Sequence, residues 1–127
     1  MTEVGGNLAI ILGAWTEMLR SGDTESMAAI LAEDVIWQGV LPEQICTNRD
    51  QVLDVLVRNR GRAPRLTKIE AAEFGDRVAV SVEGPDFEDD DEPGRSGPPS
   101  LVFTFQNGRI VRMESMSTRH AAFDSVR

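Results

Sequence analysis

The sequence predicts an α+β fold, because helical patterns come first and strands that read as an antiparallel meander come last. The strongest of three observations is Asn107-Gly108, a hairpin-turn signal between two runs rich in β-branched and aromatic residues. Apolar residues recur at helical spacing over residues 7–20, and valines alternate with small residues over 77–83. We therefore expect N-terminal helices packed in a strongly bent antiparallel sheet.

The first half of the chain predicts three helices and one short strand. The helix over residues 7–20 has one apolar face, made of Leu8, Ile11, Leu12, Trp15, Met18 and Leu19. A second helix is expected over 24–33 and a strand over 35–39, followed by an irregular stretch over 41–47. A third helix is expected over 48–59.

The second half predicts four strands and a tail helix. Residues 65–74 and 77–83 read as strands that are joined by a tight turn at Gly75-Asp76. Residues 100–117 form the hairpin around Asn107-Gly108, and a short helix follows over 118–126.

Between these strands, residues 84–99 carry no helix or strand pattern. This segment holds four prolines and the acidic run Glu88 to Glu92, so we expect a solvated loop. The sequence has no internal repeat and no linker composition elsewhere. Residues 1–127 are therefore expected to form a single domain.

Composition restricts the partners. The chain has 127 residues and a formal net charge of -8, and an acidic balance repels phosphate backbones, so nucleic acid is not an expected partner. Cys46 is the only cysteine, which excludes an internal disulfide and suits a reducing compartment. The apolar run from Leu8 to Trp15 has no Lys or Arg before it and is too short to span a membrane. We expect a cytoplasmic protein without a membrane partner.

The Asn107-Gly108 turn also sets an expected register, with Phe105 opposite Ile110 and Val102 opposite Met113. On this register one face carries Leu101, Phe103, Phe105, Ile110, Arg112, Glu114 and Met116. The other face carries Val102, Thr104, Val111, Met113 and Ser115. Neither set is polar enough for a solvent face, so both faces are expected to be covered.

Several short motifs follow one another over nearly the whole chain. They are Ala14-Trp15, Ser21-Gly22-Asp23, residues 31–37 (LAEDVIW), residues 48–52 (NRDQV), residues 75–78 (GDRV), residues 103–111 (FTFQNGRIV) and residues 118–123 (TRHAAF). With these motifs the chain resembles the nuclear transport factor 2-like superfamily, and in particular its SnoaL-like small bacterial members. The resemblance implies a cone-shaped α+β barrel with a deep pocket, usually as a homodimer.

The resemblance does not decide function, because the superfamily includes ketosteroid isomerases, polyketide cyclases, scytalone dehydratases, limonene epoxide hydrolases and pure binding domains. Its isomerases use a tyrosine and an aspartate base, whereas this chain has no tyrosine and reads Trp37-Gln38-Gly39 where the base would fall. Its cyclases place a His and an Asp on the last strand, and Met113 and Ser115 occupy those positions here. The first hypothesis is therefore a small-molecule-binding domain for an apolar ligand, without a standard catalytic set.

The same match implies which side chains line the pocket. From the hairpin they are Val102, Thr104, Val111, Met113 and Ser115. Trp15, Met18 and Trp37 can line the same pocket, although an ordinary core uses such residues as well. On this match the outer face carries Leu101, Phe103, Phe105 and Ile110, which makes it an expected dimer surface.

Two alternatives stay open. One is an enzyme of the isomerase, cyclase or epoxide-hydrolase kind that uses Glu114, Arg112 and Glu83 around a water. The other is a dimeric interaction module whose pocket is filled by its own side chains. No cofactor is expected, and no metal site either, because the single His120 and the single Cys46 lie far apart in the sequence.

Overall fold

The computed structural model describes residues 6–21, 24–59, 68–83 and 100–125. The predicted loop over 84–99 lies outside these described residues. The first half of the chain forms α1 (Gly6–Ser21), α2 (Glu25–Ile30), β1 (Leu31–Gln38), β2 (Ile45–Cys46) and α3 (Arg49–Asn59). The second half forms β3 (Lys68–Phe74), β4 (Arg77–Glu83), β5 (Ser100–Gln106), β6 (Arg109–Met116) and α5 (Arg119–Ser125).

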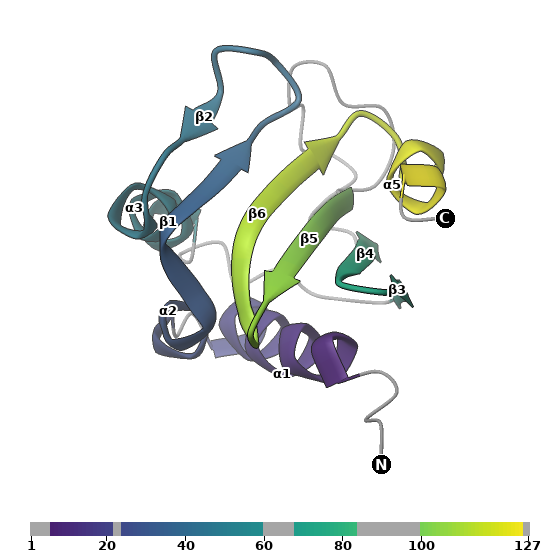
Figure 1. Cartoon of the computed structure of the whole chain (residues 1–127), viewed down its shortest axis with the longest axis horizontal. Coiled ribbons are helices and arrows are strands. Elements are labelled where there is room, and N and C mark those ends of the chain that lie inside the picture. The colour runs from purple at the N-terminus through teal and green to yellow at the C-terminus, as the bar shows by residue number, and fades with distance from the viewer. Residues whose placement is uncertain (1–5, 22–23, 60–67, 84–99, 126–127) are drawn as a thin grey trace.

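The strands form one six-stranded sheet in the order β2-β1-β6-β5-β4-β3. Every neighbouring pair is antiparallel except β1 and β6, which run parallel. The sheet is curved and unclosed, and Figure 1 shows α1 near the hairpin end of β5 and β6 with α5 near their other end. The predicted α+β class is confirmed.

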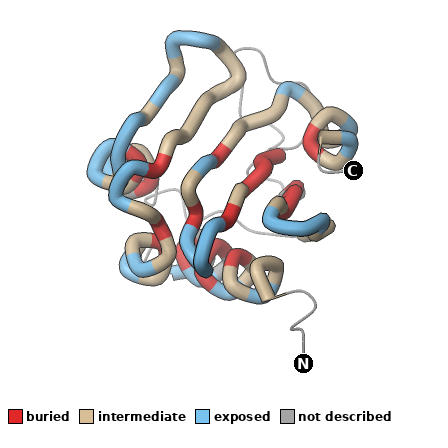
Figure 2. The backbone as a smooth tube through the Cα atoms, in the orientation of Figure 1, coloured by how far each residue is buried: buried red, intermediate tan, exposed pale blue. Residues whose placement is uncertain are grey.

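The sheet has two unlike faces. We call the face that packs against α1 and α3 the inner face, and the face that packs against α5 the outer face. The main core lies on the inner face, and the described part of the chain contributes 16 buried residues to it, among them Ile11, Trp15, Met27, Val52, Val78, Phe103 and Met113. A smaller cluster on the outer face joins α5 to the sheet through Ala79, Val102 and Ala122. Buried residues recur along α1, β5 and β6 (Figure 2).

Two expectations for the first half of the chain are wrong: where the second helix ends, and that residues 41–47 contain no strand. The helix expected over 24–33 ends at Ile30, because Leu31 takes an extended backbone (φ -87°, ψ 132°) and begins β1. Leu31 and Val35 are both fully buried in the core. Burial of their apolar side chains stabilises the strand by more than helix propensity would stabilise a further helical turn. The stretch expected to be irregular contains the two-residue strand β2, which pairs Cys46 with Trp37.

The hairpin turn is confirmed. Asn107 and Gly108 both have positive φ values, 54° and 78°, as a type I′ turn requires. Phe105 pairs with Ile110 and Gln106 with Arg109, which is the expected register next to the turn.

Beyond the turn the expected register is wrong by one residue. Thr104 pairs with Arg112 rather than with Val111, and Phe103 pairs with Met113. Val111 therefore forms a β-bulge, the device by which a strand accommodates one extra residue and bends. Because side chains alternate along a strand, every residue of β6 after the bulge lies on the face opposite to the one that the expected register gave it.

The two faces of the hairpin follow from this bulge. The inner face carries Leu101, Phe103, Phe105, Ile110, Met113 and Ser115. The outer face carries Val102, Thr104, Arg112, Glu114 and Met116. The expectation that Phe103 and Phe105 form an outer dimer surface is wrong, since they are 0% and 3% exposed in the core beneath α1.

Candidate functional site

The inner face of the sheet forms an apolar wall against α1. Trp15 lies on the apolar face of α1, and its ring meets the ring of Phe103 edge-on, with centroids 5.1 Å apart and an interplanar angle of 76°. Met18 is buried one helical turn further along α1. Met113 of β6 is also buried, and it pairs with Phe103 of β5. Edge-to-face aromatic packing of this kind holds the helix at a defined position over the sheet.

One polar contact interrupts this wall. The Trp37 indole Nε1–H donates a hydrogen bond to Ser115 Oγ at 3.0 Å. The parallel pairing of β1 with β6 explains their proximity, because Trp37 pairs with Met113 and Ser115 is the next inward residue of β6. Cys46 pairs with Trp37 and packs against the same core. The polar groups at this point are neutral, so the site favours binding and orientation over proton transfer.

The structure divides the predicted ligand-binding residues between the two faces. Met113 and Ser115 lie on the inner face with Trp37, as the resemblance implied. Val102 and Thr104 do not, which corrects the prediction. Because of the bulge at Val111 they pair with Glu114 and Arg112 instead of with Met113 and Val111, and they lie with these partners on the outer face. Val102 is fully buried under α5, and Thr104 lies between Arg77 and Arg112.

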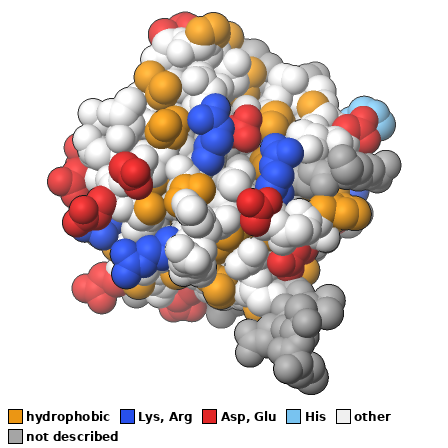
Figure 3. Space-filling view, in the orientation of Figure 1, with side chains coloured by type: hydrophobic (Ala, Val, Ile, Leu, Met, Phe, Trp, Pro, Cys, Tyr) orange, Lys and Arg blue, Asp and Glu red, His pale blue; other side chains and the backbone are white. Residues whose placement is uncertain are grey.

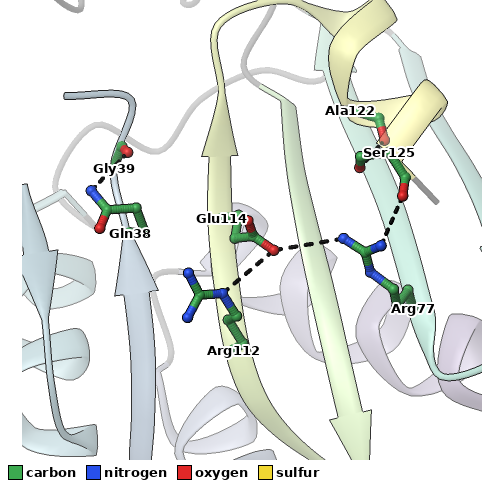
Figure 4. A network of polar contacts seen from close by, with 7 residues as sticks. All are labelled: Gln38, Gly39, Arg77, Arg112, Glu114, Ala122 and Ser125. Carbon is green, nitrogen blue, oxygen red and sulfur yellow. Dashed lines mark hydrogen bonds and ion pairs between the residues drawn. The ribbon is translucent and has the colours of Figure 1, made fainter. Parts of the chain in front are cut away.

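The candidate catalytic pair Arg112 and Glu114 also lies on the outer face. Glu114 Oε1 is 3.5 Å from Arg112 Nε and 3.7 Å from Arg77 Nη2, while Arg77 Nη1 donates to the Ser125 backbone carbonyl at 2.8 Å. Figure 4 shows this network spanning β6, β4 and the end of α5. The sheet separates it from Ser115 on the inner face, so these charges do not join the neutral site. The side chain of the third candidate, Glu83, lies outside the described part of the structure.

Other titratable groups form no second site within the described ranges. His120 is exposed and forms an i,i+4 pair with Asp124, with Nε2 and Oδ2 2.7 Å apart. No three His, Cys, Asp or Glu side chains of the described residues are arranged to hold a metal ion. Among these residues, no helix is both long and apolar enough to cross a membrane.

A tight loop follows Trp37 at the end of β1, and sequence reasoning missed it. Gln38 Nε2 donates toward the carbonyls of Leu41 (3.0 Å) and Gln44 (3.3 Å). Gln44 Oε1 accepts from the Leu41 backbone N–H at 3.0 Å, and the Gly39 N–H donates to the Gln44 carbonyl at 2.6 Å. The loop therefore fixes where β1 ends and β2 begins, and both of these strands contribute to the site.

Comparison with known proteins agrees with this architecture. A family model described as a SnoaL-like domain matches residues 12–113. A nuclear transport factor 2-like protein from Anabaena variabilis has a TM-score of 0.68 at 13% identity, with 91% of this chain and 92% of that chain covered. A candidate polyketide cyclase from Xanthomonas campestris pv. campestris has a TM-score of 0.65 at 20% identity, with coverage of 96% and 97%. No curated protein is significantly similar to this chain in sequence.

Among the solved structures, a de novo designed protein with a curved β-sheet has a TM-score of 0.63 at 17% identity, covering 91% of this chain and 87% of that chain. Likeness at such identities shows the fold and nothing about a substrate. The family model is the more specific finding, because it spans most of the sequence, from α1 to the inward-facing Met113 of β6. The chain therefore belongs to the SnoaL-like domain family of the nuclear transport factor 2-like superfamily.

Proposed function

We propose that this chain is a small-molecule-binding domain that holds an apolar ligand against the inner face of its sheet, without the standard catalytic residues of the fold. The observation that carries the proposal is the inward placement of Met113 and Ser115 beside Trp37. A thioether and a hydroxyl at these positions can contact and orient a ligand, but neither is a base at neutral pH. The alternative enzyme loses support, because its Arg112–Glu114 pair lies on the opposite face.

A thermal-shift screen of neutral hydrophobic compounds tests the binding proposal. A ligand that binds only the folded state stabilises it by about 2.7 kcal/mol at 100 times Kd, which for a domain of this size is roughly 8 °C in Tm. We expect Ser115→Glu to abolish the shift, because it places a charge on the apolar inner face. Thr104→Glu is the matched control on the outer face and should keep the shift. Absence of any stabilising compound, or an equal shift in Ser115→Glu, would contradict the proposal.

We also propose that the outer face pairs with a second copy of this chain. Ile36 and Arg112 are neighbours on β1 and β6, and the next pair along the same strands is Gln38 and Glu114. Ile45 of β2, which is 50% exposed, pairs with Gln38 and continues this row onto the next strand. Acidic and basic side chains lie together over the middle of this face, with hydrophobic side chains beside them (Figure 3). Arg with exposed aliphatic residues is a composition typical of interfaces.

The charge pattern favours a second copy as the partner. Arg112 and Glu114 carry opposite charges two residues apart on one strand, so a two-fold axis between them places each arginine over the partner's glutamate. Such a surface is complementary to itself, and electrostatic complementarity of this kind gives specificity to an interface.

Two charge reversals test the dimer. Arg112→Glu alone leaves two acidic side chains on β6 at the axis, and Glu114→Arg alone leaves two basic ones, so each variant should dimerise at least about 10-fold more weakly in sedimentation velocity. An equimolar mixture of the two should restore dimers, because each surface then meets its opposite. Arg109→Glu, beside the turn, makes the same charge change outside this patch and should leave the dimer intact. A monomeric wild type, or a mixture no more dimeric than its components, would refute the proposed interface.

A further inference from the structure

The Trp15 indole N–H is a buried donor for which the described residues offer no acceptor. Trp15 is 7% exposed, and its Nε1 atom has no hydrogen-bond partner among the described residues. An unpaired buried donor costs about 1–3 kcal/mol, and native proteins leave few of them. Phenylalanine would give a similar apolar contact with Phe103 without that penalty. The nitrogen at this position therefore needs an explanation that packing does not supply.

The same face offers a second donor. Ser115 Oγ accepts the hydrogen bond from Trp37 Nε1, which leaves the serine hydroxyl hydrogen to be donated elsewhere. The two positions are connected along the inner face, because Trp15 packs on Phe103, Phe103 pairs with Met113, and Met113 precedes Ser115 by two residues. A ligand lying along this face meets hydrogen-bond donors near both ends of that path.

Charged groups are scarce on this face. Glu73 pairs with the inward Val78, and its Oε1 accepts from the Leu8 backbone N–H at 3.2 Å, so this carboxylate is engaged at the start of α1. The described arginines on the sheet, Arg77, Arg109 and Arg112, lie on the outer face. A charged ligand would lose its hydration here without gaining a counter-ion, which is strongly unfavourable.

We infer that the ligand is a neutral, mainly apolar molecule bearing an oxygen acceptor, and that this oxygen accepts the Trp15 Nε1–H. The inference rests on the proposed function and specifies the ligand of the same site. In the bound state the oxygen satisfies the orphan donor, while the rest of the molecule contacts the apolar wall. The Ser115 hydroxyl supplies a second donor for a ligand with two such oxygens.

A pair of isosteric probes tests this inference. 2-Acetylnaphthalene carries a ketone, and 2-isopropylnaphthalene has nearly the same shape without an acceptor. Dissociation constants for both are measured by isothermal titration calorimetry with wild type and with Trp15→Phe. The ratio of the two constants should shift against the ketone by about 3- to 10-fold in Trp15→Phe, the range for one neutral hydrogen bond. Thr104→Val, which removes a hydroxyl donor from the outer face, is the control, and its ratio should stay within about twofold of wild type.

The outcomes separate this inference from the proposal beneath it. If both probes bind and the ratio is the same in wild type and Trp15→Phe, the hydrogen bond does not form, while the apolar site stands. If neither probe binds up to its solubility, the apolar site itself fails and the inference with it. Should Trp15→Phe fail to fold, replacement of Trp15 by 3-benzothienylalanine removes the N–H and keeps the ring shape, and the same shift is required of it.

Discussion

Phe103→Ala is expected to destabilise the protein by about 3–5 kcal/mol, the range for truncating a fully buried aromatic residue. Phe103 is 0% exposed and lies at the centre of the inner face, between the Trp15 ring and Met113. The truncation removes the edge-to-face contact that seats α1 and leaves a cavity that neighbouring strands cannot close. Urea denaturation followed by circular dichroism measures the loss as a lower midpoint at an unchanged slope.

Phe74→Ala is the matched control for this prediction. Phe74 also lies on a strand, but it is 49% exposed, so we expect a loss of about 1 kcal/mol or less. Equal losses in the two variants would contradict the buried placement of Phe103. So would a Phe103→Ala protein that keeps wild-type stability but becomes monomeric, since that result is expected of an outer dimer surface.

Gly39→Ala is expected to destabilise the protein by about 2 kcal/mol, although the change adds a single methyl group. A Cβ at residue 39 would lie 2.5 Å from Gln44 Cβ and 2.6 Å from Gln44 Oε1. Gln44 cannot move aside freely, because its backbone and side chain both bond to Leu41 and its carbonyl accepts from Gly39. The loop must therefore break hydrogen bonds or shift the ends of β1 and β2.

Thermal denaturation of Gly13→Ala provides the contrast. Gly13 is exposed on α1, and a Cβ there would meet nothing within 4 Å. Alanine is the better helix former by about 0.5–1 kcal/mol, so this variant should be more stable than wild type. If Gly39→Ala also melts at or above the wild-type temperature, then the close approach of Gly39 to Gln44 does not constrain the loop.

Local patterns predicted most of the elements because each had a local cause. The periodicity of α1, the alternation of β4 and the positive φ values needed at Asn107-Gly108 are all properties of neighbouring residues. The errors lie where distant residues decide. Leu31 leaves the helix to join a sheet whose partner strand, β6, lies about 80 residues later, at Ile110.

The candidate site was predictable only in part, for the same reason. Met113 and Ser115 were placed inward by resemblance, whereas Val102 and Thr104 were misplaced by extending the hairpin register through a bulge. A glycine within a strand often marks a bulge, but Ile110-Val111-Arg112 carries no such signal. The lack of an acceptor for Trp15 Nε1 among the described residues has no sequence signature either, because it depends on which acceptors the folded chain brings near.

The bulge also bears on how the lengths of related chains can differ. Val111 takes part in neither ladder of β6: β5 skips it between Phe105 and Thr104, and β1 skips it between Leu31 and Ile36. A deletion within a central strand normally turns every following side chain over. Removal of this one residue would instead straighten β6 and leave all the remaining partners as they are. A one-residue alignment gap at the bulge is therefore compatible with an unchanged pair of surfaces, and a one-residue gap further along β6, past Arg112, is not.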